Sequence, residues 1–207
     1  MAMTAKSRLQ PVVQLTITLD EVKPKVARTV AVPYRIRLDG LHQVIQAAMG
    51  WTNSHLYLFT TRGICWGEVD SDGDSDGMLP ASHTRLCDVV ADTGAKSFKY
   101  VYDFGDHWQH TVKIGRMTEM PLEMADPFLL GATGRCPRED SGGAHGYLEL
   151  LAALADPTHA RHAESVERLG ADYDPAKVDD RRHTEAVKSL GRQRPKARPR
   201  ERPRQSA

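Results

Sequence analysis

The greatest concentration of chemically active side chains lies in Tyr100–His110, Tyr-Val-Tyr-Asp-Phe-Gly-Asp-His-Trp-Gln-His. Four of its residues can bind a metal ion or move a proton: Asp103, Asp106, His107 and His110. A later segment adds three groups of the same kind: Glu139, Asp140 and His145. Imidazoles and carboxylates are the usual ligands of zinc, manganese or iron in hydrolytic sites. A metal-dependent hydrolase would therefore require the later segment to fold onto the earlier one.

The same residues also have structural interpretations, which the sequence leaves open. His110 shares a strand face with Trp108 and Val112, which favours a place in the core with one hydrogen bond. Asp106 follows Gly105, and the pair is typical of an ordinary turn. Glu139 and Asp140 either cap backbone amides or pair with an arginine, or else form an acid/base pair beside His107.

Alternating aromatic residues predict the element that positions Tyr100–His110. Residues 98–104 and 108–114 each place bulky side chains at every second position, which indicates two antiparallel strands. The turn falls at Gly105, where a residue without Cβ is expected to take a positive φ. The sequence thus predicts a β-hairpin with a polar tip. Trp51, Trp66 and Trp108 flank apolar strands and are expected in the core rather than on a surface that stacks bases.

The N-terminal third predicts a hairpin followed by a helix. Alternation over residues 13–19 indicates a half-buried strand, and a second strand is expected from Lys25 to Val32. A helix is expected to begin at Asp39 as its cap and to end at Gly50. Its apolar residues fall on one stripe, which needs a sheet to cover.

The remaining segments predict shorter elements. Strands are expected at residues 55–60 and around 65–67, and a short helix at residues 85–92. Residues 115–143, rich in Met, Pro and Gly, are expected to form a long ordered loop. Three helices should follow: one from Ala144, one over residues 160–169, and one opened by Asp174-Pro175 and running to Leu190.

An acidic segment, residues 70–77, resembles the first half of a calcium-binding loop. Asp72, Asp74, Asp76 and Gly77 have the EF-hand spacing, in which alternate carboxylates converge on one cation. The similarity ends at the twelfth position, where His83 replaces the bidentate glutamate. Two interpretations remain, a weak calcium site and a solvated acidic loop.

Charge is distributed unevenly along the chain, although the net charge is only +1. The C-terminal residues 191–207 are predicted to be disordered, because prolines interrupt them and nothing apolar is present to bury. Against Glu201 this tail carries seven basic residues: Arg192, Arg194, Lys196, Arg198, Arg200, Arg202 and Arg204. Such a tail can neutralise phosphates and bind nucleic acid without sequence preference. It can equally be a solubilising terminus.

Compartment and redox state follow from simpler features. No apolar run approaches a membrane span and residues 1–10, expected to be flexible, lack the apolar part of a signal peptide, so we expect a cytoplasmic protein without membrane contact. Cys65, Cys87 and Cys136 are odd in number and lack Cys-x-x-Cys spacing, which argues against a disulfide framework and a zinc knuckle. Cys136 also has no evident thiolate activator, which argues against a nucleophile.

Four segments together resemble the plasmid pRiA4b ORF-3-like family, also described as TnpR-like passengers of insertion elements. These segments are Leu41–Trp51 with His55-Leu56, Tyr100–His110, Cys136–Gly143 with Gly146-Tyr147, and Asp156-Pro157 to Asp174-Pro175. The resemblance covers residues 10 to 180. It implies a single α+β domain, here residues 11–190, with a curved antiparallel or mixed β-sheet packed by helices and with C-terminal helices.

The resemblance implies no established activity. A serine resolvase, as the TnpR label suggests, needs a nucleophilic serine amid arginines and a C-terminal helix-turn-helix, and neither is evident here. Leu58 stands where the family often has Glu, and Arg138 where a second proline is common, which argues against a shared site around His55.

The sequence is consistent with three functions. The first is a non-enzymatic module of a mobile element that binds a protein or DNA partner, with the basic tail adding nucleic-acid affinity. The second is a metal-dependent hydrolase or nuclease, which requires the Asp103–His110 hairpin tip to meet the Glu139-Asp140 loop. The third is a structural or regulatory domain without nucleic-acid contact.

Overall fold

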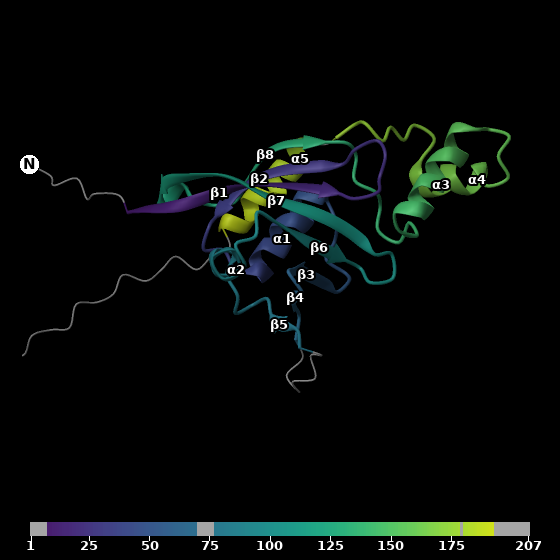
Figure 1. The fold of residues 1–207 in the computed structure, drawn as a ribbon. Helices are drawn as coiled ribbons and strands as arrows, with labels where there is room; N and C mark the ends of the chain where they lie inside the picture. Colours follow the sequence, from purple (N-terminus) through teal and green to yellow (C-terminus); the bar gives the residue numbers. More distant parts are fainter. Residues whose placement is uncertain (1–7, 70–76, 179, 193–207) are drawn as a thin grey trace, which may run out of the picture.

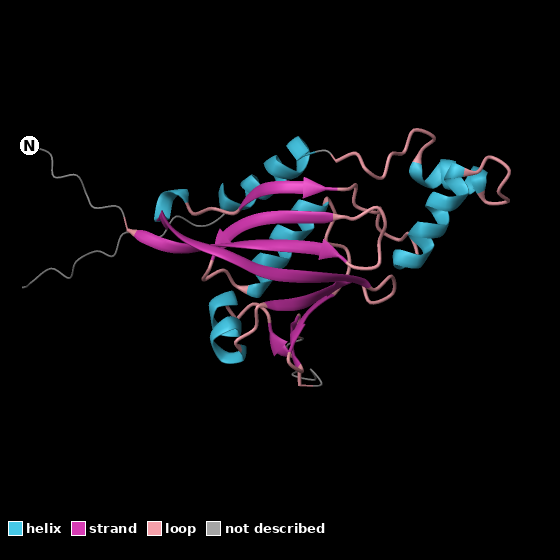
Figure 2. Ribbon diagram, turned by 45° about the horizontal axis from the view of Figure 1, so that its top comes forward, coloured by secondary structure: helices cyan, strands magenta, loops and turns pink. Residues whose placement is uncertain are grey.

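The computed structural model describes residues 8–69, 77–178 and 180–192, which form an eight-stranded sheet and its covering helices (Figures 1 and 2). The strand order is β5-β4-β3-β6-β7-β1-β2-β8. All neighbouring strands are antiparallel except β4 and β5, which are parallel. The strands are β1 Leu9–Leu19, β2 Ala27–Pro33, β3 Tyr57–Thr61, β4 Ile64–Gly67, β5 Leu79–Pro80, β6 Ser97–Tyr102, β7 Trp108–Pro121 and β8 Phe128–Thr133. The expected α+β fold with a mixed sheet is therefore confirmed.

The predicted N-terminal hairpin and helix are present, with one correction. β1 pairs with β2 from Val12↔Pro33 to Thr18↔Ala27, and α1 spans Leu38–Met49, ending at Gly50 with φ 87°. Asp39 does not cap this helix, because Arg37 occupies the N-cap and Asp39 lies in the first turn. The first amides are satisfied by neighbouring backbone instead: Leu38 N–H donates to the Thr84 carbonyl over 2.9 Å.

The central hairpin forms as predicted, but its turn differs. β6 pairs with β7 from Ser97↔Lys113 to Tyr102↔Trp108. Gly105 does not have the expected positive φ; Asp103 (φ 58°) and His107 (φ 53°) do. The five-residue connection needs left-handed residues at its two ends, and Asp tolerates that conformation because its short polar side chain bonds locally.

The region predicted as a long loop, residues 115–143, contains the end of one strand and the whole of another. β7 continues to Pro121, a 3-10 turn spans Leu122–Met124, and β8 pairs with β2 as an edge strand. The prediction was wrong because these strands are partly exposed on both faces and so lack apolar alternation. Only residues 134–142 form the loop that precedes the next helix.

Four of the helices form two pairs (Figure 1). α1 and α5 (Asp180–Arg192) pack together against one face of the sheet, while α2 (Leu86–Thr93) follows β5. α3 (Gly143–Ala155) and α4 (His162–Leu169) form a pair that projects beyond one end of the sheet (Figure 2). α5 begins later than predicted: Asp174 accepts from the Ala176 amide in a separate turn, so Asp174-Pro175 does not open the helix.

The main core joins the sheet to both helix pairs. It contains β1 and β2 side chains, the α1 stripe, and Tyr147 and Leu150 of α3. Trp51, Trp66 and Trp108 are all buried in it, as predicted. None of the helices in the described residues has the length and apolar character needed to cross a membrane.

Candidate metal centre at one end of the sheet

The two polar segments identified from the sequence meet at the end of the sheet beside α3. Asp106, in the β6–β7 turn, accepts a hydrogen bond through Oδ2 from the Gly142 amide over 3.1 Å. Gly143 has φ 67°, and a Cβ there would lie 2.3 Å from the Asp106 carbonyl oxygen. This contact therefore requires glycine, and it fixes the hairpin turn against the start of α3.

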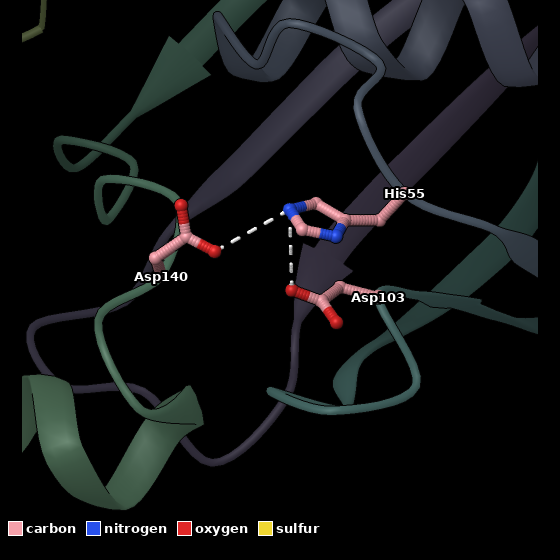
Figure 3. Close-up of side chains that lie close together, drawn as sticks. All are labelled: His55, Asp103 and Asp140. Atoms are coloured by element: carbon pink, nitrogen blue, oxygen red, sulfur yellow. Dashed lines mark ion pairs between the residues drawn. The ribbon is translucent and has the colours of Figure 1, made fainter.

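His55 joins Asp103 and Asp140 in one cluster (Figure 3). His55 Nε2 lies 3.6 Å from Asp103 Oδ2 and 3.4 Å from Asp140 Oδ1. One ligand atom from each of the three residues lies within 4.8 Å of the other two. The three side chains come from separate segments: the approach to β3, the β6–β7 turn and the loop before α3.

These spacings suit three ligands of one ion better than direct hydrogen bonds. A hydrogen bond to a carboxylate is normally about 2.7–2.9 Å long. Two ligands bound tetrahedrally at about 2.0–2.1 Å from a metal lie about 3.3 Å apart. One imidazole with two carboxylates suits zinc, manganese or iron, and the ion would balance the two negative charges.

Local backbone structure orients the Asp103 carboxylate. Its Oδ1 accepts from the amides of Gly105 (2.9 Å) and Asp106 (3.3 Å), which leaves Oδ2 directed at His55. The Asp103 amide donates to the Leu56 carbonyl over 2.9 Å, and so fixes the register of His55 relative to the turn. The Asp103 side chain is only 10% exposed. This carboxylate is held in place before any ion binds.

Asp140 forms the open side of the cluster. Its side chain is 75% exposed and its φ is 58°. Its backbone carbonyl accepts from an Arg168 Nη over 2.5 Å, so α4 fixes the position of this loop residue. The adjacent Glu139 accepts from the Tyr102 hydroxyl (2.5 Å), the Thr52 amide (3.0 Å) and the Thr52 hydroxyl (2.6 Å). Glu139 thus ties the loop to β6 and to the segment that carries His55.

The other predicted site residues lie elsewhere or play other parts. His107 is exposed in the turn, and its amide donates to the Asp103 carbonyl over 2.6 Å. His110 is buried in the core, where its Nδ1 lies 3.3 Å from the Tyr100 carbonyl and burial lowers its pKa to about 4. His145 is 87% exposed on α3 and faces Glu149. Cys136 is a weak nucleophile, because burial raises the pKa of its thiol to about 12.

Two sets of predicted residues lie outside the described structure. The calcium candidates Asp72, Asp74 and Asp76 fall in residues 70–76, and the basic residues from Arg194 to Arg204 fall in residues 193–207. Arg192 ends α5.

His55 was not among the residues singled out from the sequence, and the differences from the family pattern argued against a site there. The signal that would have found it is strand pairing rather than residue type. β3 pairs with β6 in the register Tyr57↔Tyr102, which places the residues just before β3 beside Asp103. Periodicity does not give strand order, so this neighbour was hidden.

The fold and the cluster define a single α+β domain with an open mixed sheet and an imidazole–carboxylate cluster at one end. The chain belongs to the family described as Plasmid pRiA4b ORF-3-like protein, which matches residues 11–182. Uncharacterized protein y4hQ of Sinorhizobium fredii is 52% identical over 180 residues, covering 86% of this chain and 92% of its own. The crystal structure of a protein of unknown function, MM3350 from Methanosarcina mazei Go1, is similar with a TM-score of 0.73 and 29% identity, over 83% of this chain and 97% of that one.

Proposed function

We propose that this protein is a metal-dependent hydrolase whose divalent ion is held by His55, Asp103 and Asp140. The observation that carries the proposal is the 3.4–3.6 Å spacing of His55 Nε2 from the two carboxylates. The sequence-based condition for a hydrolase was that the hairpin tip and the Glu139-Asp140 loop meet, and the Asp106–Gly142 hydrogen bond supports that condition.

The chemistry follows from the small number of protein ligands. Three ligands leave coordination positions for water, and a bound divalent ion lowers the pKa of that water and polarises a substrate oxygen. The exposed Asp140 side supplies an open approach, whereas Asp103 is anchored on the protein side. Glu139 is engaged by Tyr102 and Thr52 and therefore acts as a positioning residue for the loop.

Removing either carboxylate is expected to abolish tight metal binding. Changes to residues that only orient a metal ligand already cost about 10–100-fold in affinity, so Asp103→Asn or Asp140→Asn should weaken binding at least about 100-fold. Asn suits both positions because it also tolerates a positive φ. The measurement is calorimetric titration of tag-free, chelator-treated protein with zinc and with manganese, together with elemental analysis of the untreated protein.

Matched controls are available on the same domain. His145→Ala removes an exposed histidine outside the cluster, and Asp92→Asn removes an exposed carboxylate of α2. Both should bind metal as the wild type does. Wild-type protein that binds neither ion, or cluster variants with unchanged affinity, would refute the metal centre. Metal binding without any metal-stimulated hydrolysis of nitrophenyl esters and phosphate esters would refute the hydrolase.

A second candidate function is nucleic-acid binding through the C-terminal tail, favoured by its six basic residues after Arg192 against one acidic residue. If these residues contact phosphates, deleting residues 193–207 should reduce the dependence of log K on log salt for duplex DNA by about 5. Fluorescence anisotropy at 50–200 mM salt measures this slope. An unchanged slope, with only solubility altered, would support a domain without nucleic-acid contact.

A further inference from the structure

A polar pocket of about 400 Å³ is lined in part by the loop that carries Asp140. Its walls come from the end of α1, residues 135–139 of the loop, Tyr173 and α5. The positively charged lining consists of Arg135, Arg138 and Arg182, with His183 beside them. Small-molecule sites have volumes of about 300–1,000 Å³, so the pocket can hold a molecule no larger than a nucleotide.

Three arginines line this pocket against one acidic residue, Glu139. The Glu139 carboxylate already accepts hydrogen bonds from Tyr102 and from Thr52. Within the described part of the chain, neither Arg135 nor Arg138 forms an ion pair. The Arg135 guanidinium lies 4.5 Å from the centre of the Tyr173 ring, which holds it by a cation–π contact. The lining therefore carries more positive than negative charge, which favours an anion.

We propose that this pocket binds the phosphate group of a small phosphate ester. The planar guanidinium fork matches phosphate oxygens bidentately, and both the loop and α5 contribute arginines to the lining. Arg138 is two residues from Asp140, so one loop contributes to both the pocket and the proposed metal centre. As a statement about the substrate, the inference rests on the proposed hydrolytic function. Anion binding itself does not require the metal.

Calorimetric titration of chelator-treated protein with inorganic phosphate and with adenosine monophosphate tests the pocket directly. The double variant R138A/R182A should bind both probes at least about tenfold more weakly, because it removes one arginine of the loop and one of α5. Arg138→Lys should fall between, since it keeps the charge but loses the fork. Arg116→Ala removes an exposed arginine of β7 and should have no effect.

The outcomes separate this proposal from the metal centre. Asp140→Asn should keep phosphate affinity while losing metal, and R138A/R182A should keep metal affinity while losing phosphate. Wild-type protein that binds neither probe, or a double variant with wild-type affinity, would overturn the phosphate site. Binding of a single-stranded oligonucleotide in the absence of adenosine monophosphate binding would overturn the assignment to a small ester.

Discussion

Replacing Arg28 by alanine is expected to lower the free energy of unfolding by about 3–5 kcal/mol. Arg28 is fully buried in β2, and its guanidinium binds four backbone carbonyls. Nε donates to Ala48 at the end of α1 (2.7 Å), and Nη1 donates to Ala27, Thr133 and Gly134 at 2.8–3.1 Å. The variant would remove this donor from all four carbonyls and would open a cavity among them.

Two further variants distinguish lost hydrogen bonds from lost volume. Arg28→Met fills most of the space but donates nothing, so it should recover only part of the stability. Arg116→Ala, on the exposed part of β7, should change stability by less than about 0.5 kcal/mol. Denaturant unfolding monitored by tryptophan fluorescence gives all three values. A loss below about 1 kcal/mol for Arg28→Ala would mean that this network does not hold β2, α1 and β8 together.

The Arg28 network also matters for the proposed sites. Thr133 ends β8 and Gly134 begins the loop that carries Arg138, Glu139 and Asp140. Gly134 has φ 70°, and a Cβ there would lie 2.2 Å from the Lys25 carbonyl oxygen. A buried cation and a glycine thus set the point from which the loop departs. Nothing in the local sequence pattern predicts that Arg28, the second residue of β2, is fully buried.

Sequence patterns predicted a helix or strand well where one of its faces is buried and the other is exposed to solvent. β1, α1 and the β6–β7 hairpin each have that character, and their alternation or stripe located them. β8 failed because Phe128–Thr133 is partly or fully exposed along its length. The start of α5 was predicted too early, because Asp174-Pro175 has the composition of a helix start but forms an isolated turn. Local composition cannot distinguish these cases without the tertiary contacts.

The candidate site was only partly predictable for a related reason. Asp103 and Asp140 were recognised by residue type, but so were His110, which lies in the core, and His145, which is exposed on α3. His55 is brought to the cluster by the pairing of β3 with β6, two segments almost fifty residues apart in the sequence. The positive φ of Asp103 was likewise assigned to Gly105, since glycine is the usual residue for that conformation.

Acid is expected to destabilise the fold through two buried histidines, His42 and His110. His42 lies in a closed ring of hydrogen bonds with Tyr100, Gln46 and Asn53. Gln46 donates to the Tyr100 hydroxyl, which in turn donates to His42 Nδ1, while His42 Nε2 donates to Asn53. Protonation of Nδ1 would place two donors against each other and open the ring. Burial lowers the pKa of His42 to about 4.

Protonation of His110 in the folded protein is also unfavourable, for a different reason. Its Nδ1 donates to the Tyr100 carbonyl, and its buried Nε2 has no hydrogen-bond partner among the described residues. Protonation would bury an N–H without an acceptor between Trp51 and Tyr100. Burial again lowers the pKa to about 4.

The direction of the pH effect follows from these depressed values. The unfolded chain binds a proton on each histidine near pH 6.5, whereas the folded chain does not until about pH 4. Each neutral histidine therefore makes its full contribution to the free energy of unfolding above pH 6.5. This contribution, about 3 kcal/mol for each histidine, is lost as the pH decreases toward 4. Denaturant unfolding at pH 7.0, 5.5 and 4.5 measures the slope. His110→Leu should remove about half of it and exposed His145→Ala none, whereas equal stability at pH 7.0 and 4.5 in the wild type would contradict the assignment.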